Sequence, residues 1–189
     1  MGDADRVIAA FDHAVSLHQR VARDGAGAIV QAAAVVREAL TAGRKVLAFG
    51  NGGSATDAEH FAAELVGRFS RHVERRGLPV LALTTDTAVM TSVANDFGYG
   101  AVFARQIDAF GASGDVALAL TTSGRSENVN EALRWALDRG MKTIALTGSD
   151  GGQSGHLADV HVNVPDASPA RVQEVHRTIL HVMCELIET

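Results

Sequence analysis

The segment KVLAFGNGGSATDAEHFAAELVGRF (residues 45–69) decides the fold of this chain. Its apolar run, Val46–Phe49, is typical of a buried parallel strand, and a Gly-rich turn at residues 50–53 follows it. From Ser54 onward apolar residues recur at helical spacing, so the segment predicts a strand, a turn and a helix. Such a turn brings backbone N–H groups and the positive end of a helix dipole close to a ligand.

The predicted helix at 54–69 also carries a titratable pair. His60 and Glu64 stand at positions i and i+4, so both side chains point the same way one turn apart. Ser54 reads as a helix N-cap and equally as a ligand contact. A ligand cradle and a titratable pair on one short element indicate an enzyme site.

Composition narrows the class of protein. The chain has 189 residues, 47% hydrophobic and 21% charged, with a net charge of −5, which is typical of a globular protein. This charge argues against a nucleic-acid-binding or membrane surface but leaves room for a local anionic substrate. The single cysteine, Cys184, is expected to be a buried small hydrophobe. With no signal-peptide pattern in MGDADR and no membrane-spanning apolar run, a cytoplasmic location is expected.

From residue 45 onward, strand and helix patterns alternate. Strands are predicted at 45–50, 79–84, 115–121, 142–147 and 159–164, and helices at 54–69, 86–95, 100–110, 126–139 and 168–188. This alternation predicts an α/β fold, with a doubly wound, parallel five-stranded sheet between helical layers.

Two further helices, at 3–21 and 26–42, precede the sheet and have no place in the alternation. They could cover the sheet or pack against another copy of the protein, and the second arrangement is the one predicted. The prediction is one domain over 1–189, with N-terminal helices in 1–43 and an α/β core in 44–189.

In doubly wound sheets ligands bind at the carboxyl ends of the strands. The loop from Thr121 to Ser126 follows a predicted strand and places four hydroxyls around a glycine at a helix N-terminus, which suits a phosphate monoester. A capping cluster without a ligand is the alternative. Asn95 and Asp96 read first as a turn that ends a helix. The polar run 70–77 reads as solvated surface.

A nicotinamide site is the competing interpretation of the Gly-rich turn. Residues 50–55 match G-x-G-x-x-A, but this fingerprint also needs an acid about 20 residues later. The nearest candidate, Asp86, lies 36 residues beyond Gly50. The pattern therefore disfavours a dinucleotide.

The last predicted helix holds Gln173 and His181 among apolar residues. They are eight residues apart, or about 12 Å of helix rise. They can converge on one small ligand only by leaning towards each other over two turns.

Taken together, these segments resemble the sugar isomerase (SIS) family and, within it, the phosphoheptose isomerases. The resemblance spans nearly the whole chain and rests on five segments in order: GNGGSATDAEHFAAEL (50–65), NDFG (95–98), TTSGRSENV (121–129), ALTGSDGG (145–152) and RVQEVHRTILH (171–181). It implies the same parallel sheet between helical layers. It also implies a homotetramer with active sites at the subunit interfaces, which would give the two N-terminal helices a purpose.

The resemblance also implies roles for individual residues. The phosphate of sedoheptulose 7-phosphate would be held by Thr121, Thr122, Ser123 and Ser126. The sugar would be lined by Asn51, Gly52, Gly53, Ser54, Asn95 and Asp96, and contacted by Glu64 and Gln173. One zinc ion per subunit would be bound by His60, Glu64, Gln173 and His181. Glu64 and His181 would form the catalytic acid–base pair.

The implied reaction converts sedoheptulose 7-phosphate to D-glycero-D-manno-heptose 7-phosphate through an enediol. Moving a proton between neighbouring carbons needs a base at the carbon and an acid at the carbonyl oxygen, and a carboxylate and an imidazole can share these tasks. A metal could polarise the carbonyl or hold the ligands in place. His and Glu are ordinary zinc ligands, whereas Gln is an unusual one.

Two other functions remain open on the sequence. A non-enzymatic SIS protein, such as the DnaA-binding initiator-associating regulator, shares the fold, but that group lacks the helical Glu and the final His that this chain has in Glu64 and His181. The isomerase of another phosphosugar is the second. One departure from the family is Ala170, which stands where an acid is common, and no role is assigned to nearby Asp166.

Overall fold

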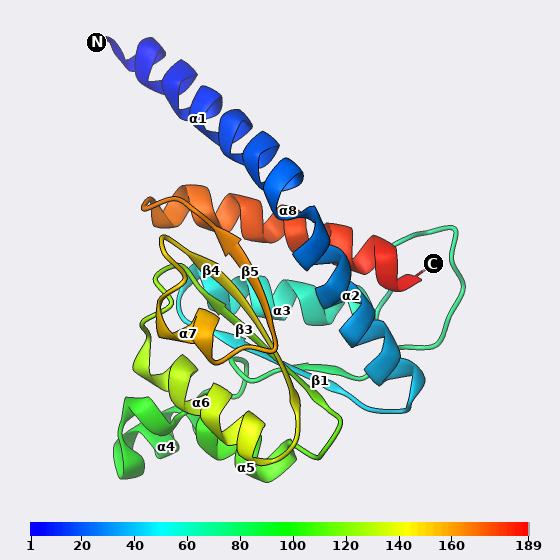
Figure 1. Ribbon diagram of the computed structural model, residues 1–189. Helices are drawn as coiled ribbons and strands as arrows, with labels where there is room; N and C mark the ends of the chain where they lie inside the picture. Colours follow the sequence, from blue (N-terminus) through cyan, green and yellow to red (C-terminus); the bar gives the residue numbers. More distant parts are fainter. Residues whose placement is uncertain (189) are drawn as a thin grey trace.

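The computed structural model describes residues 1–188. The strands are β1 (Val46–Gly50), β2 (Val80–Ala82), β3 (Val116–Thr121), β4 (Lys142–Gly148) and β5 (Val160–Val164). The helices are α1 (Asp3–Asp24), α2 (Ala26–Thr41), α3 (Gly53–Val66), α4 (Thr87–Phe97), the 3₁₀ turn η1 (Tyr99–Ala101), α5 (Ala104–Phe110), α6 (Glu127–Asp138), α7 (Gly152–His156) and α8 (Pro169–Glu188). Figure 1 shows their arrangement.

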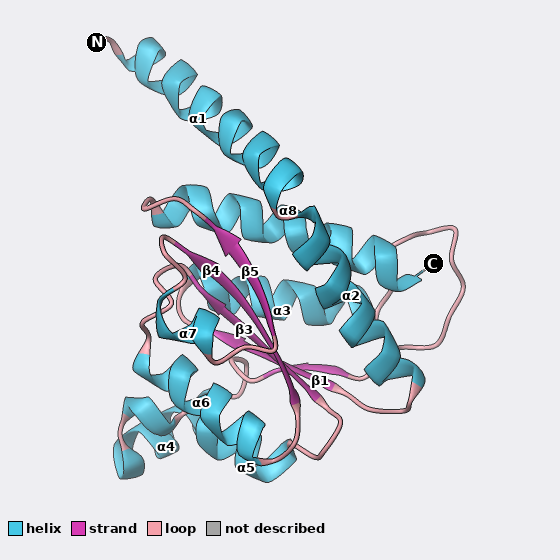
Figure 2. Cartoon of the chain, in the orientation of Figure 1, coloured by secondary structure: helices cyan, strands magenta, loops and turns pink. Residues whose placement is uncertain are grey.

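The five strands form one parallel sheet in the order β2-β1-β3-β4-β5. This is the doubly wound order predicted from the alternation, and it reverses between β1 and β3. Helices cover both faces of the sheet (Figure 2). The strands are nearly continuous apolar runs because side chains on both faces are buried.

Each face of the sheet has its own apolar core. On one face, Val46 and Ala48 of β1 pack with residues of α1, α2, α3 and α8. On the other, Leu47 and Phe49 pack with α5 and α6. Helices α3 and α6, which follow the two strands at the reversal point, therefore leave it on opposite faces. Cys184 is buried in the first core and unpaired, as expected, and burial raises the pKa of its thiol to about 12.

The two halves of α1 differ in how they pack. Its second half packs on the body through Leu17 and Val21, which are 4% exposed. Its first half projects away from the sheet (Figure 1) and leaves Phe11 69% exposed. The apolar stripe of that half, predicted from its periodicity, has no partner within residues 1–188. No helix in the described part of the chain is long and apolar enough to cross a membrane.

The structure differs from the predicted elements mainly at three helices. The helix predicted at 54–69 ends at Val66: the Gly67 N–H still donates to the Ala63 carbonyl, but those of Phe69 and Ser70 donate to Glu188 instead of to helical carbonyls. The helix predicted at 100–110 is divided into η1 and α5. The short helix α7 was missed, because five residues with two glycines offer no apolar periodicity.

Candidate active site

Two of the predicted loops meet where the strand order of the sheet reverses, between β1 and β3. Asn51 follows β1, and Asn128 lies in the first turn of α6, after β3. Their carboxamides exchange two hydrogen bonds, each 2.9 Å long, and the Asn128 oxygen also accepts from the Val129 N–H. The Tyr99 hydroxyl donates to the Asn51 oxygen at 3.0 Å. Asn51 is thus held in one orientation at the mouth of the Gly-rich turn.

The Gly-rich turn differs from the prediction at Ser54. The N-cap position is occupied by Gly52, with a φ of 56°, and α3 begins at Gly53, so Ser54 is not the cap. Ser54 is 2% exposed, and its N–H donates to the Asn51 carbonyl. Gly53 lies in close contact with the Gln173 carboxamide, since a Cβ at Gly53 would lie 2.6 Å from the Gln173 Nε2. The turn therefore packs directly against α8.

The hydroxyl loop sits on the neighbouring strand. Thr121 is buried, and its Oγ1 accepts the Gly124 N–H at 3.2 Å and lies 3.4 Å from the Ser126 hydroxyl. Ser126 is at the N-cap position of α6 but makes no capping hydrogen bond with its side chain. Gly124 has a φ of 64°, and a Cβ there would lie 2.0 Å from the Gly151 carbonyl oxygen. Capping therefore does not account for the Ser126 hydroxyl.

The remaining hydroxyls of this loop are open to solvent in part. Thr122 is half-buried, and Ser123 is exposed and accepts the Arg125 N–H at 3.2 Å. Arg125 turns its guanidinium to Asp150, 2.6 Å away. The loop thus presents hydroxyls that are partly open to solvent, and the Arg125 guanidinium is already paired with Asp150.

Helices α3 and α8 run in the same direction, side by side. Gly53 meets Gln173, the Arg177 Nε donates to the Asp57 Oδ1 at 2.7 Å, and the His60 Nε2 lies 2.7 Å from the His181 Nε2. An open depression of about 550 Å³ lies over the first two of these contacts and is lined by His18, Gly53, Thr56, Asp57, Gln173, Glu174 and Arg177. Gln173 thus lies beside the Gly-rich turn, near the start of both helices. His60, Glu64 and His181 come together further along the same two helices.

The three groups further along are His60, Glu64 and His181. Their ligand atoms all lie within 4.8 Å of one another, and the His60 Nε2 is 3.3 Å from the Glu64 Oε1. All three side chains are half-buried, and the Phe69 ring lies 5.7 Å from the His181 ring. Burial, helped by the nearby Arg177 and His181, lowers the pKa of His60, while Glu64 opposes the shift. A neutral imidazole is the form that binds a metal.

This donor set fits zinc. Two imidazole nitrogens and one carboxylate oxygen are a common set of three protein ligands, which leaves one coordination position for a water or a substrate oxygen. Gln173, the fourth predicted ligand, is not brought into the cluster. Its carboxamide lies against Gly53, seven residues before His60, so its role as a metal ligand stays a prediction.

Other predicted residues lie elsewhere. Asn95 and Asp96 are exposed on the last turn of α4, where the Asn95 amide donates to the Asp96 carboxylate at 2.7 Å. The helix is capped by Gly98 beyond them, so they do not form the terminating turn. Asp86, the candidate acid of a dinucleotide site, caps α4 by accepting the Val89 N–H. Asp166 accepts from His13 and from the Ser168 N–H, at the contact of α1 with the start of α8.

Sequence reasoning missed several residues of the site. Asn128, Tyr99 and Phe69 were not singled out, nor was the ion pair of buried Asp57 with half-buried Arg177. Asn128 stood directly after the hydroxyl loop, which was the signal available for it. The others had none, because each acts through a contact with a segment distant in sequence.

Comparison with known proteins gives a consistent result. The SIS domain family matches residues 11–148. A phosphoheptose isomerase from Geobacter sulfurreducens is 51% identical over 88% of this chain and 87% of its own length. One from Aquifex aeolicus is 52% identical over 85% of this chain and 83% of its own.

Solved structures agree. The phosphoheptose isomerase from Neisseria gonorrhoeae superposes with a TM-score of 0.92 at 42% identity, covering 97% of both chains. That from Francisella tularensis superposes with a TM-score of 0.95 at 38% identity, covering 100% of this chain and 99% of its own.

Proposed function

The chain belongs to the SIS domain family and, within it, to the phosphoheptose isomerases, and we propose that Glu64 and His181 move the proton in the reaction it catalyses. That reaction is the interconversion of sedoheptulose 7-phosphate and D-glycero-D-manno-heptose 7-phosphate. The observation that carries the proposal is the half-buried cluster in which a carboxylate and two imidazoles lie within 4.8 Å. The non-enzymatic regulator is not supported, since the relatives described above, at about half of their residues identical, are named phosphoheptose isomerases.

The chemistry needs one proton removed and one delivered. A base takes a proton from C1 of the ketose while an acid protonates the C2 carbonyl oxygen, which gives the enediol. Return of a proton to C2 and loss of one from the C1 hydroxyl completes the aldose. Glu64 and His181 project from two different helices towards one point, so they can serve neighbouring carbon and oxygen atoms of one bound sugar.

The Gly-rich turn and the hydroxyl loop would hold the rest of the substrate. We place the phosphate against Thr121, Thr122, Ser123 and Ser126, where hydroxyls and the N-terminus of α6 favour an anion. The sugar hydroxyls would meet Asn51, Gly52, Gly53 and Ser54, and then Gln173 beside them. The orientation of Asn51 by Asn128 supports this assignment. Asn95 and Asp96 would join from α4.

One zinc ion per subunit is part of the proposal, held by His60, Glu64 and His181, with Gln173 as the fourth ligand. When bound it would polarise the substrate carbonyl as a Lewis acid. The chain itself supplies the half-buried setting and a His60 imidazole that burial keeps neutral.

We also propose a homotetramer with active sites at the subunit interfaces. The exposed apolar stripe on the first half of α1, including Phe11 at 69% exposed, supports it, because such a stripe is normally covered. Light scattering tests this directly, and a monomer at micromolar concentration would contradict it.

The proposal includes one SIS domain over the whole chain and a cytoplasmic location, in keeping with a charged sugar that does not cross a bilayer unaided.

The test of the catalytic pair uses Glu64→Gln and His181→Asn. Each change keeps the shape of the side chain and removes its proton transfer, so kcat for sedoheptulose 7-phosphate should fall about 10²–10⁴-fold with little change in melting temperature. Glu59→Gln, on the same helix, is the matched control and should keep turnover. The unmutated enzyme in D₂O should place deuterium at C2 of the product. Near-normal turnover in both variants would exclude the pair.

A further inference from the structure

The connection from α3 to β2, residues 67–79, is longer than the two to six residues usual for such a loop. The sequence predicts its polar run as solvated surface, but the structure buries part of it. The Arg75 side chain is 13% exposed, and that of its partner Glu188 is 3% exposed. The contacts of this buried ion pair show which parts of the chain it holds together.

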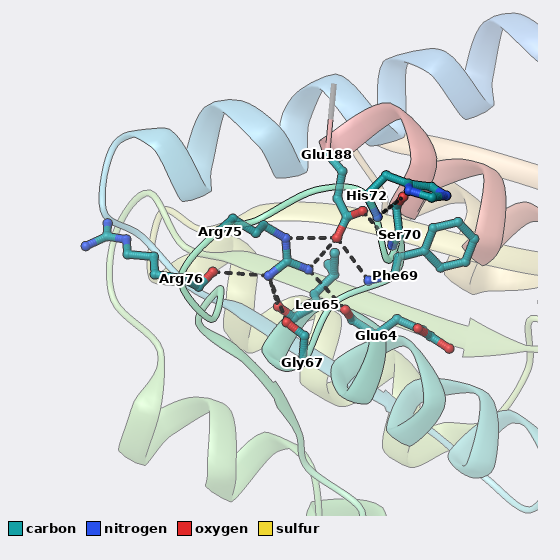
Figure 3. Close-up of polar contacts among 9 residues, drawn as sticks. All are labelled: Glu64, Leu65, Gly67, Phe69, Ser70, His72, Arg75, Arg76 and Glu188. Atoms are coloured by element: carbon teal, nitrogen blue, oxygen red, sulfur yellow. Dashed lines mark hydrogen bonds and ion pairs between the residues drawn. The ribbon is translucent and has the colours of Figure 1, made fainter.

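Glu188 gathers donors from this loop (Figure 3). Its Oε1 accepts from the Arg75 Nε at 2.9 Å and lies 2.7 Å from Nη2. The same carboxylate accepts the Phe69 N–H at 3.0 Å and the Ser70 N–H at 2.9 Å. Burial alone would raise the pKa of Glu188, but the hydrogen bonds from Phe69, Ser70 and Arg75 outweigh it, and the pKa lies below its ordinary value. The carboxylate therefore stays ionised at neutral pH.

The other side of the Arg75 guanidinium closes the end of α3. Nη1 donates to the Leu65 carbonyl at 2.7 Å and to the Gly67 carbonyl at 3.2 Å, and Nη2 donates to the Glu64 carbonyl at 3.1 Å. Carbonyls in the last turn of a helix have no partner within it, and a cation there also suits the helix dipole. Arg75 thus caps the helix that carries His60 and Glu64.

The clamp formed by Arg75 and Glu188 reaches both helices of the reacting cluster. It binds the backbone of Glu64 itself, and on α8 it is anchored two turns beyond His181. It also fixes Phe69, whose ring contacts the imidazole of His181. The clamp therefore joins the C-terminal ends of α3 and α8, the two helices that carry Glu64 and His181.

This inference rests on the isomerase function given above: we propose that Arg75 and Glu188 are positioning residues that set the distance between Glu64 and His181. Neither touches the substrate. Misplacing a reacting group by about 1 Å can cost about 10²-fold in rate. The hydroxyl loop, residues 121–126, follows β3, whereas the clamp bonds α3, α8 and the connection between α3 and β2. Substrate binding should therefore be largely spared.

The test compares Arg75→Gln, Arg75→Lys and Glu188→Gln. In Arg75→Gln, kcat should fall about 10–100-fold, while KM stays within about threefold. Arg75→Lys keeps the charge but lacks the planar fork, so it should recover part of kcat. If Arg75→Gln does not fold, the other two variants decide the same question. Hydrogen exchange should also be faster at the Phe69 and Ser70 amides in each variant.

Two controls separate positioning from stability. Arg76→Gln removes the same charge from the next position, where the exposed side chain points away from the clamp (Figure 3), and should leave kcat unchanged. Val36→Ala destabilises the far core on α2 and should lower the melting temperature without lowering kcat at 25 °C. Unchanged kcat in a folded Arg75→Gln, a rise in KM alone, or an equal kcat loss in Val36→Ala would each overturn the inference.

The outcomes also distinguish this inference from the function on which it rests. If the unmutated protein isomerises the heptose phosphate and Glu64→Gln does not, the function stands, and only the clamp is under test. If Glu64→Gln retains full turnover, the proposed proton transfer has failed. The exchange rates of Phe69 and Ser70 then still report whether Arg75 holds the loop.

Discussion

Replacing Asn128 with alanine tests how the structure orients the sugar-binding turn. This buried side chain, 3% exposed, makes three hydrogen bonds, two with Asn51 and one with the Val129 N–H. At about 1 kcal/mol each, and with half-buried Asn51 able to reach water, Asn128→Ala should cost about 2–3 kcal/mol. For a chain of this size that is a fall in melting temperature of about 5–10 °C. KM should rise too, because Asn51 loses its fixed orientation.

A double-mutant cycle isolates the pair. Asn51→Ala, Asn128→Ala and the double variant are unfolded with urea at one protein concentration, and the two shared hydrogen bonds predict a coupling energy of about 1–2 kcal/mol. Asn163→Ala, two strands away on β5, serves as the control and should add to Asn128→Ala within about 0.5 kcal/mol. A coupling below about 0.5 kcal/mol would refute the view that the two amides hold each other.

Three more predictions concern the hydroxyl loop, the metal and the buried His176 of α8. Ser123→Ala with Ser126→Ala should raise KM for the sugar phosphate at least about tenfold, with an unchanged fold by circular dichroism, since charge-assisted hydrogen bonds contribute about 1.5–3 kcal/mol each; an unchanged KM would leave the loop without a phosphate. Metal analysis should find about one zinc ion per chain, and much less in His60→Ala; full activity in chelator, with no metal detected, would remove zinc. Burial lowers the pKa of His176 from 6.5 to about 4, so the unfolded chain binds the proton first. Stability held above pH 6.5 should therefore decline towards pH 4 by up to about 3 kcal/mol, and His176→Phe should flatten this decline in urea unfolding.

The sequence by itself determined the parallel sheet and its five strands to within a few residues, and the helices apart from α7 and the division of 100–110 into η1 and α5. This worked because β1, β3 and β4 are buried on both faces, which makes each a continuous apolar run. It also placed His60 and Glu64 on one face of a helix, since spacing along a helix fixes direction. Those properties depend only on neighbours in the chain.

Tertiary structure decided what local spacing cannot. His181 comes to within 2.7 Å of His60 only because α3 and α8 pack in the same direction, and that packing keeps Gln173 beside Gly53 instead. The pairing of Asn51 with Asn128, and of Arg75 with Glu188, joins segments far apart in the sequence. A polar residue reads as solvated surface until its partner is known. The sequence predicts Arg75 as a surface charge. In the structure it caps α3 and is largely buried, because the loop after α3 folds back over the end of the last helix.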